Sequence, residues 1–359
     1  MDISTPESVH LGPLLVVAPA ITVSFGGAWL TGLVGALAVA AQVSIAVFHG
    51  GLSTPNHIAQ IIGLAFLSIM AVIVRLVRDR RSSELVQVRS VSETAQRALL
   101  RPLPRRLGPL HISSTYLAAA KEASIGGDLY AVARTGNRTR VLIGDVRGKG
   151  LAAVGEAAAL MGAFQEAAYQ HATLPALASA LDHSACRYLT QFPGADDEVQ
   201  EHFITALLLE IPDDDFVARL THCGHPSPLL ISRGQVTSVP SPPAPPLGMC
   251  ALEQGIRTSH TFSFEPGDTL LLFTDGLVEA RDASGAFYPL EGRLAQWAKC
   301  SPEALIEWLQ RDLLTYTGGA LRDDAAVLVI RRAGLVHDGR RYGELVGSDG
   351  RQVADHDHR

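Results

Sequence analysis

The sequence has no Asp, Glu, Lys or Arg between Glu7 and Arg75, and this uncharged stretch restricts the possible folds more than any other feature. Two of its segments, 29–48 and 58–77, reach the length of about 20 apolar residues that a helix needs to cross a bilayer. A third segment, 11–24, is shorter. Helices of a soluble core keep a polar stripe, and a cleaved signal peptide is shorter and begins with basic residues. We therefore expect a membrane anchor over residues 1–80, with two or three transmembrane helices.

Four arginines in the segment RLVRDRR, residues 75–81, follow the last apolar segment directly. Basic residues beside a span mark its cytoplasmic side, so we expect a multi-pass protein of the cell membrane whose remaining chain is cytoplasmic. The four cysteines are scattered without short spacings, which argues against a disulfide framework and against a cysteine zinc site. The net charge of −6 gives no indication of nucleic-acid binding.

Residues 81–107 are expected to link the membrane anchor to a soluble domain. Residues 82–100 predict one helix, with small or apolar residues at spacings of three and four. Such a short seam fits a simple spacer, and it also fits a helix that forms a homodimer and couples the membrane to the soluble domain. Pro102 and Pro104 end this helix. A domain over residues 108–331 follows, and the polar tail at 332–359 is expected to be disordered.

The soluble domain mixes strand and helix patterns in an order that predicts an α+β fold. Eight strand patterns include DLYAVART, TRVLIGDV, HFITALLLEI and AAVLVIRR, and several of them alternate apolar with polar residues, as antiparallel strands do. Two helix patterns arrive together after TRVLIGDV, the second of these strands, and two more follow TLLLFTDG. This order predicts an antiparallel β-sandwich flanked by helix pairs.

Acidic residues stand at the ends of four predicted strands. They are Asp128 in IGGD, Asp145 in IGDVRGKG, Asp275 in LLFTDG, and the pair Asp323 and Asp324 in RDDAAV. An Asp-Gly after a single strand is usually a turn, but four such sites can place carboxylates together. Clustered carboxylates raise each other's pKa unless a cation neutralises them, and all-oxygen ligands suit Mg²⁺ or Mn²⁺. We expect two ions that activate a water for attack on phosphorus, with the Val146 carbonyl as a further ligand.

The ordered motifs GGDLY, GDVRGKGLAA, FITALLLEI, LTHCGHPSPLLI, PPLGM, LLLFTDGLVEARD and RDDAAVLVI resemble those of metal-dependent Ser/Thr protein phosphatases. They are most similar to the bacterial branch that includes the sporulation stage II E phosphatase and the phosphatases that regulate sigma factors. The resemblance covers about residues 108–331. It implies an antiparallel β-sandwich with flanking helix pairs, and a membrane-anchored arrangement like that of actinobacterial members.

The resemblance also implies roles for individual residues. Asp128, Asp145, Asp275 and Asp323 would be the catalytic metal ligands, with Asp145 bridging both ions and Asp324 the weaker candidate of its pair. The sequence departs from the branch in three motifs: Ala131 ends GGDLYA, Arg147 replaces a serine, and His222 takes the place of an asparagine.

Arg147 and Lys149 are either solvated turn residues or ligands of the substrate phosphate, since Arg forks and Lys point charges both suit phosphate. His222 and His225 flank Cys223, and a turn at the edge of the sandwich is a better interpretation than a metal site, because no third ligand is near in sequence.

Together these features predict a membrane-anchored, Mg²⁺- or Mn²⁺-dependent protein serine/threonine phosphatase. The resemblance implies a phosphorylated regulatory protein as its partner and substrate, such as an anti-anti-sigma factor. Two alternatives stay open at this point: a non-catalytic signalling scaffold whose metal site has decayed, and a phosphohydrolase of small molecules.

Overall fold

The computed structural model describes residues 17–48, 55–119, 126–191, 202–242, 244–250 and 257–333. The chain forms two compact units, Met1–Val91 and Ser92–Arg359, which divide within a helix. The tail predicted at 332–359 lies outside the described residues from position 334 onward, as does most of the loop expected between the two apolar segments.

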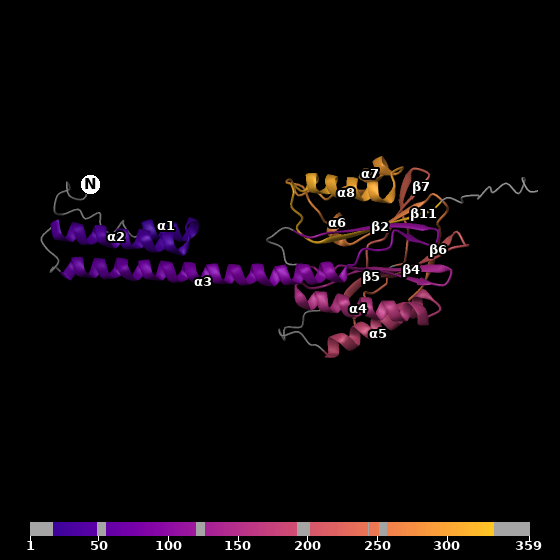
Figure 1. Cartoon of the computed structure of the whole chain (residues 1–359), viewed down its shortest axis with the longest axis horizontal. Helices are drawn as coiled ribbons and strands as arrows, with labels where there is room; N and C mark the ends of the chain where they lie inside the picture. The colour runs from indigo at the N-terminus through magenta and orange to yellow at the C-terminus, as the bar shows by residue number, and fades with distance from the viewer. Residues whose placement is uncertain are drawn as a thin grey trace, which may run out of the picture. The chain divides into compact units, whose positions relative to one another are not determined.

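The described part of the first unit is helical, and its helices are α1 (Val17–Phe25), α2 (Ala28–Phe48) and the greater part of α3 (Pro55–Leu99). Two stretches, Ala28–Val47 and His57–Ser83, are long and apolar enough to cross a membrane. The third predicted segment contributes α1, whose nine residues rise only about 14 Å. The linker helix predicted at 82–100 is not separate, because α3 runs without a break through the same residues (Figure 1). No Gly or Pro interrupts the sequence between Gly63 and Pro102, so nothing there stops a helix.

The second unit contains two antiparallel sheets. One has the order β1-β2-β11-β10-β7-β8 and the other the order β3-β4-β5-β6-β9. The strands of the first sheet are β1 (Arg106–Leu107), β2 (Leu110–Leu117), β11 (Ala325–Arg332), β10 (Thr269–Phe273), β7 (Leu229–Ser232) and β8 (Gln235–Ser238). Those of the second are β3 (Leu129–Thr135), β4 (Arg138–Val146), β5 (Ile204–Pro212), β6 (Val217–Cys223) and β9 (His260–Ser263).

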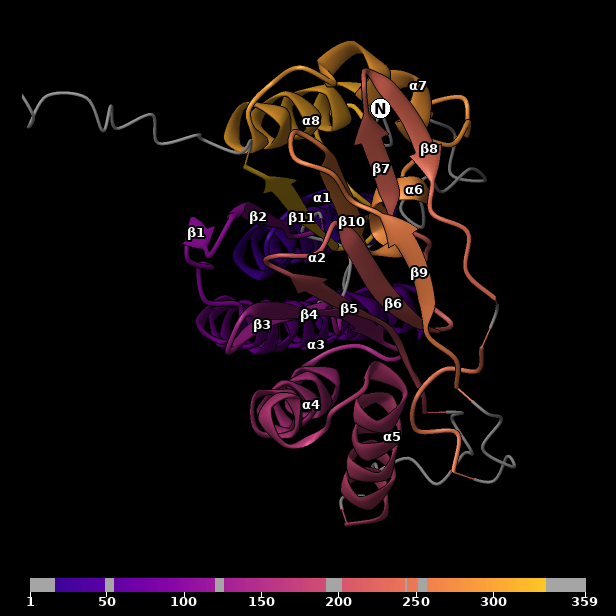
Figure 2. The ribbon, with the colours of Figure 1, turned by 90° about the vertical axis from the view of Figure 1, so that its right-hand side faces the viewer.

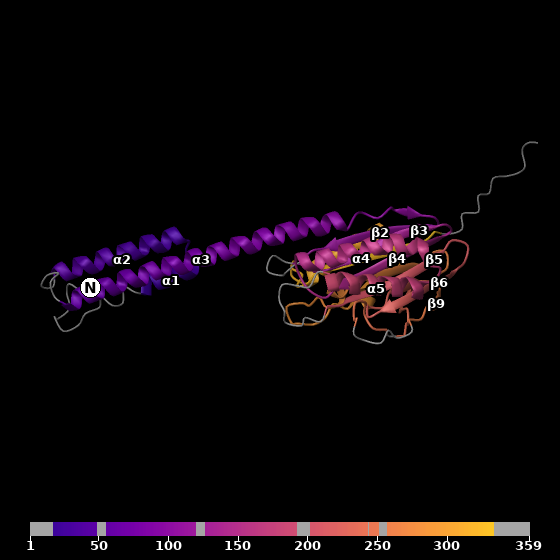
Figure 3. The same cartoon turned by 90° about the horizontal axis from the view of Figure 1, so that it is seen from below.

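Helix pairs cover the outer faces of the two sheets (Figures 1 and 3). Helices α4 (Leu151–Gln170) and α5 (Leu174–Gln191) pack on the second sheet. Helices α7 (Leu290–Leu294) and α8 (Pro302–Tyr316), with the 3-10 turn η3 (Ala295–Trp297), pack on the first. The short helix α6 (Asp275–Val278) follows β10. Figure 2 shows the layers seen along the sandwich. The predicted sandwich with flanking helix pairs is thus confirmed.

Alternating side chains of the central strands divide the hydrophobic core into three layers. In β4, Val141 and Ile143 pack between the sheets, while Leu142 and Val146 face α4 and α5. Strand β11 alternates in the same way between the inner layer and the layer under α7 and α8. Because both faces are buried, these strands are almost continuously apolar, which explains runs such as FITALLLEI.

The structure corrects one sequence prediction outright. Cys186 on α5 and Cys250 form a disulfide although 64 positions separate them. The spacing of the cysteines does not indicate this bond, because residues distant in sequence meet where the segment containing Cys250 packs on α5. Strands β1, β8 and β9 and helix α6 were not predicted, and none of them is longer than four residues.

Candidate metal centre

The predicted acidic residues lie at one end of the sandwich because of the antiparallel register. Leu129, which follows Asp128, pairs with Gly144, which precedes Asp145. In the other sheet, Phe273 at the end of β10 pairs with Val327 near the start of β11. The antiparallel pairing of β3 with β4 therefore brings Asp128 close to Asp145. The pairing of β10 with β11 brings Asp275 close to Asp323 and Asp324 in the same way.

A hydrogen bond between side chains joins the two sheets at this end. The Thr274 hydroxyl donates to Oδ2 of Asp128 at 3.1 Å and accepts from the backbone N–H of Ala326 at 2.9 Å. Asp128 is only 2 % exposed. Burial, followed by the charges of Asp145 and Asp324, raises the pKa of Asp128 well above its usual value, and the bond from Thr274 opposes this shift. A charge on Asp128 is therefore costly, and a bound cation would stabilise it.

Asp145 and Val146 lie against the glycine pair before Asp128. The backbone N–H of Val146 donates to the Gly127 carbonyl at 3.2 Å. A Cβ on Gly127 would stand 2.8 Å from the Val146 carbonyl oxygen, so only glycine allows this close approach. Burial first, and then nearby acids led by Asp275 and Asp323, raise the pKa of Asp145 to about 7. These raised pKa values include electrostatic repulsion between carboxylates that come from different strands.

The two acids of RDD have different roles in the structure. Asp324 is 3 % exposed, and its two oxygens accept hydrogen bonds from the backbone N–H groups of Ala119 and Gly126. Asp323 has a half-exposed side chain, and its Oδ2 lies 3.9 Å from Nζ of Lys149. Asp324 therefore anchors the loop before Asp128, whereas Asp323 presents its carboxylate to the open side of the cluster.

The open side of the cluster also carries the basic residues of the glycine turn. Lys149 is about half exposed, and the Arg147 guanidinium lies over the Phe203 ring with 4.9 Å between its Cζ and the ring centroid. Gly148 and Gly150 have φ of 133° and 79°, which favours glycine at both positions. Asp275, the first residue of α6, is exposed too, but partial burial of its carboxyl group together with Glu279 and Asp323 raises its pKa.

The donor set fits hard divalent cations. It consists of carboxylates and one backbone carbonyl, which Mg²⁺ and Mn²⁺ prefer over nitrogen and sulfur. Within the described ranges, no three His, Cys, Asp or Glu side chains are already arranged as a complete metal site. Burial first, and neighbouring carboxylates second, raise the pKa values of Asp128, Asp145 and Asp275, and cations bound there would offset both effects.

Several residues that hold this cluster were not identified from the sequence. Gln96, on the last turns of α3, is 1 % exposed, and its amide donates to the Asp128 carbonyl at 3.4 Å. The Tyr116 hydroxyl donates to Oε1 of Gln96 at 2.9 Å. Thr274 could have been noticed because it directly precedes Asp275 in sequence, whereas no sequence signal distinguishes Gln96 from other residues of its helix.

The two histidines of THCGH form part of the packing behind the cluster. Nδ1 of His225 lies 3.1 Å from the Thr205 hydroxyl, which donates to the Asp145 carbonyl at 3.5 Å. Burial lowers the pKa of His225 to about 3, so this ring is neutral. The Cys223 thiol accepts a hydrogen bond from Arg257.

Comparisons with known proteins identify a family and a fold for this chain. A family model described as Stage II sporulation protein E matches residues 135–333. The structure of the RsbU and RsbW domains of Rv1364c from Mycobacterium tuberculosis matches with 25 % identity and a TM-score of 0.52, covering 63 % of this chain and 60 % of that one.

Two further solved structures share the fold. The SiaA-PP2C domain of Pseudomonas aeruginosa matches with 19 % identity and a TM-score of 0.57, covering 71 % of this chain and 98 % of that one. The PP2C phosphatase domain of SpoIIE from Bacillus subtilis, with a fragment of its regulatory domain, matches with 18 % identity and a TM-score of 0.50, covering 62 % and 63 %. The chain thus spans about three fifths of the Rv1364c and SpoIIE chains that it matches.

Proposed function

The chain belongs to the Stage II sporulation protein E family and carries a PP2C-type phosphatase domain, and from this premise we propose that it is a metal-dependent protein serine/threonine phosphatase. The observation that carries the proposal is the convergence of Asp128, Asp145, Asp275 and Asp323 at one end of the sandwich, with pKa values raised by burial and mutual repulsion in the first three. A decayed site in a scaffold protein would have no reason to keep this costly arrangement.

Asp128, Asp145, Asp275, Asp323 and the Val146 carbonyl are the groups that would hold the cations. Two Mg²⁺ or Mn²⁺ ions, when bound, supply Lewis acidity toward phosphoryl oxygens and lower the pKa of a coordinated water. Arg147 and Lys149, on the exposed turn beside Asp323, would bind and orient the phosphate of the substrate. Thr274 would keep the Asp128 carboxylate in place through its hydrogen bond.

The exposure of this site suits a phosphorylated residue on another protein. Asp323 and Lys149 are each about half exposed, and Asp275 and Arg147 are exposed as well. A phosphoserine or phosphothreonine on a folded protein can therefore reach the cluster. We propose a phosphorylated regulator, such as an anti-anti-sigma factor, as the substrate. One of the matched structures holds an RsbU domain and an RsbW domain together, which supports a signalling role of this kind.

The apolar helices support a proposal for the location of the protein. Ala28–Val47 and His57–Ser83 meet the length and hydropathy of membrane spans, and four arginines lie in the stretch 75–81. We propose that two spans anchor the chain with its phosphatase domain in the cytoplasm, and that α3 is the helix through which a homodimer would form.

The activity is tested with the full-length protein in lipid nanodiscs and a phosphoserine-containing protein substrate. Mn²⁺ should stimulate phosphate release, and EDTA should abolish it. Asp145→Asn should reduce the rate by at least about 100-fold, since it removes a charged group at the reacting centre. Asp214→Asn, which changes an exposed Asp in the turn between β5 and β6, serves as the matched control and should keep full activity. Activity that survives EDTA or Asp145→Asn would refute the proposal.

A further inference from the structure

A cavity of about 550 Å³ lies at the end of the sandwich opposite the acidic cluster. Arg138 begins β4 and Asp145 stands near its end, so seven residues of extended strand, about 23 Å, separate the two places. The cavity is bounded by the β5–β6 hairpin, the start of β4 and the connection from α4 to α5. A volume of this size can hold a small organic molecule.

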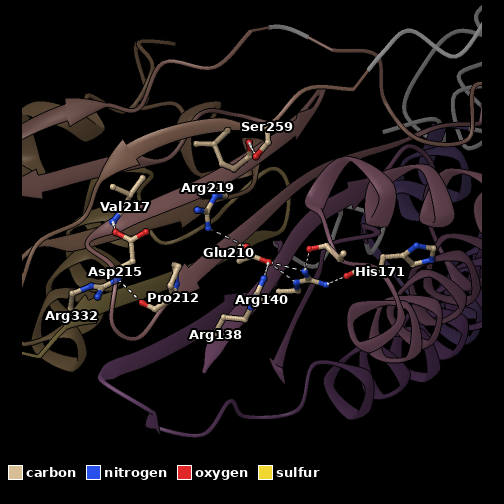
Figure 4. A network of polar contacts seen from close by, with 12 residues as sticks. Arg138, Arg140, His171, Glu210, Pro212, Asp215, Val217, Arg219, Ser259 and Arg332 are labelled. Carbon is tan, nitrogen blue, oxygen red and sulfur yellow. Dashed lines mark hydrogen bonds and ion pairs between the residues drawn. The ribbon is translucent and has the colours of Figure 1, made fainter. Parts of the chain in front are cut away.

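Glu210 lines the cavity and forms a buried ion pair with Arg140, which is not itself a lining residue. Nε and Nη2 of Arg140 donate to Oε2 of Glu210 at 2.9 and 2.7 Å, and both side chains are no more than 4 % exposed (Figure 4). Nη1 of Arg140 donates to the carbonyls of Ala168 and His171 at the end of α4. Arg140 therefore neutralises Glu210 and caps a helix, which leaves it no role toward a ligand.

Two further arginines approach the Glu210 carboxylate at longer distances, from opposite sides in Figure 4. Nη1 of Arg138 lies 3.5 Å from Oε2 of Glu210, and Nη1 of Arg219 lies 3.4 Å from Oε1 (Figure 4). Their side chains are 41 % and 39 % exposed. Among the described residues, Glu210 is the one acidic partner of either group. Since a guanidinium has five N–H donors, both arginines keep donors that a bound anion can use.

The charge of the cavity favours an anion. The charged residues that line it are Arg138, Arg219, Glu210 and Asp215, which balance. The buried Arg140 already neutralises Glu210, so one positive charge is left over for a ligand. Asp215 lines the cavity as well, and its Oδ1 accepts from the backbone N–H of Val217 at 3.1 Å, within its own turn.

The remaining walls supply polar donors and apolar surface. Asn137, Thr173 and Ser259 offer side-chain hydrogen-bonding groups, and Leu174 and Pro175 contribute apolar contacts. The last two also form the first turn of α5, whose positive end adds to the attraction for an anion. The ligand that matches these walls has a multiply charged oxyanion and a compact apolar body.

We propose that this cavity is a binding site for a small organic phosphate, whose phosphate group lies between Arg138 and Arg219 and whose apolar part packs on Leu174 and Pro175. A phosphate suits the site better than a carboxylate does, because its three oxygens can accept from both guanidinium groups at once. The site is separate from the acidic cluster and does not depend on the proposed phosphatase activity.

The test is calorimetric titration of the full-length protein in lipid nanodiscs with phenylphosphonate, which no phosphatase hydrolyses. EDTA is present, so that the acidic cluster holds no cations and repels anions. One saturable site is expected. Arg138→Gln and Arg219→Gln should each weaken binding about 10-fold or more, because each removes charge-assisted hydrogen bonds. The double variant should show no saturable binding.

Arg233→Gln is the matched control, since Arg233 is 85 % exposed and pairs with Glu265. It should bind phenylphosphonate as the unchanged protein does. Arg138→Lys keeps the charge but not the fork, so it should lose affinity by a smaller factor even if the Gln variants fold poorly. The proposal is overturned by the absence of saturable binding, by a double variant that binds normally, or by tighter binding of phenylacetate than of phenylphosphonate.

Discussion

Replacing Gly127 by alanine tests whether the Val146 carbonyl is part of the metal centre. The added Cβ would lie 2.4 Å from Cβ of Val146 and 2.8 Å from its carbonyl oxygen, whereas ordinary contacts of carbon atoms begin near about 3.5 Å. The carbon–carbon difference, 3.5 − 2.4, requires a backbone shift of about 1.1 Å, more than the ~0.5 Å within which a functional group must be held. Overpacking of this kind costs roughly 1–3 kcal/mol. If the shift moves the carbonyl away from the cations, Mn²⁺ affinity should fall about 10- to 100-fold.

The assay is calorimetric titration of Mn²⁺ into the metal-free protein, together with the Mn²⁺ concentration that gives half-maximal phosphatase activity. Gly162→Ala is the matched control, because Gly162 lies within α4 and a Cβ there meets nothing within 4 Å. Alanine in a helix is favoured over glycine by about 0.5–1 kcal/mol, so this variant should bind Mn²⁺ normally and unfold at an equal or higher temperature. A Gly127→Ala protein with unchanged Mn²⁺ affinity would show that the Val146 carbonyl does not hold a cation.

Three further changes test other parts of the structure. Thr274→Val removes the hydroxyl that donates to Asp128 at 3.1 Å, and the loss of this bond to a charged group should cost about 1.5–3 kcal/mol of the free energy that holds the carboxylate in place. The Mn²⁺ concentration for half-maximal activity should therefore rise, and an unchanged concentration would contradict the assigned hydrogen bond. Cys186→Ser removes the disulfide to Cys250, which closes a loop across a sequence separation of 64. The variant should lower the free energy of unfolding of the oxidised protein by about 4 kcal/mol, and dithiothreitol should no longer change its Tm. If dithiothreitol does not change the Tm of the unchanged protein either, the disulfide is absent. Burial lowers the pKa of His225 to about 3, whereas the unfolded chain protonates this ring below about 6.5, so its contribution to stability is present above pH 6.5 and lost as the pH falls toward 3. His225→Gln should therefore show a shallower decline in urea stability over this pH range, and an equal slope would mean that the ring is not buried in its neutral form.

The sequence patterns were sufficient to predict the long central strands of the two sheets. Strands such as β4 and β5 are apolar on both faces because they lie between two core layers, and this burial makes them easy to recognise. The acidic cluster was predictable for a related reason. Asp128 directly precedes β3 and Asp145 lies near the end of β4. The antiparallel pairing of these two strands follows from the short turn that joins them, so local sequence is enough to predict that the two acids lie close together.

Structural features that depend on contacts between distant parts of the chain could not be predicted from local sequence patterns. Cys186 and Cys250 are joined through the packing of an irregular segment on α5, where Gly248 donates to Asp182 and Leu247 pairs with Ile204. Short edge strands such as β8 carry mostly exposed side chains, so their composition resembles that of a loop. The resemblance ranked Asp323 above Asp324 as a metal ligand, but no pattern in the sequence separates the two, because adjacent carboxylates differ only in the direction in which the backbone points them.

Helix α3 crosses the division between the two compact units of the chain. Prolines at 102 and 104 predict a domain boundary after the linker helix, and that boundary stays a prediction; the compact units divide at Val91, so the last turns of α3 belong to the second unit. Gln96 and Leu100 are buried there at 1 % and 6 % exposure. Small and apolar residues at spacings of three and four are equally expected for a spacer, a dimer seam and a helix packed on a domain. At the C-terminal end of α3, Gln96 identifies a helix packed on a domain, because its side chain bonds to the Asp128 carbonyl and the Tyr116 hydroxyl and fixes the helix end to the loop of a candidate metal ligand. Removal of Gln96 would leave buried polar atoms unpaired at a cost of about 1–3 kcal/mol of stability.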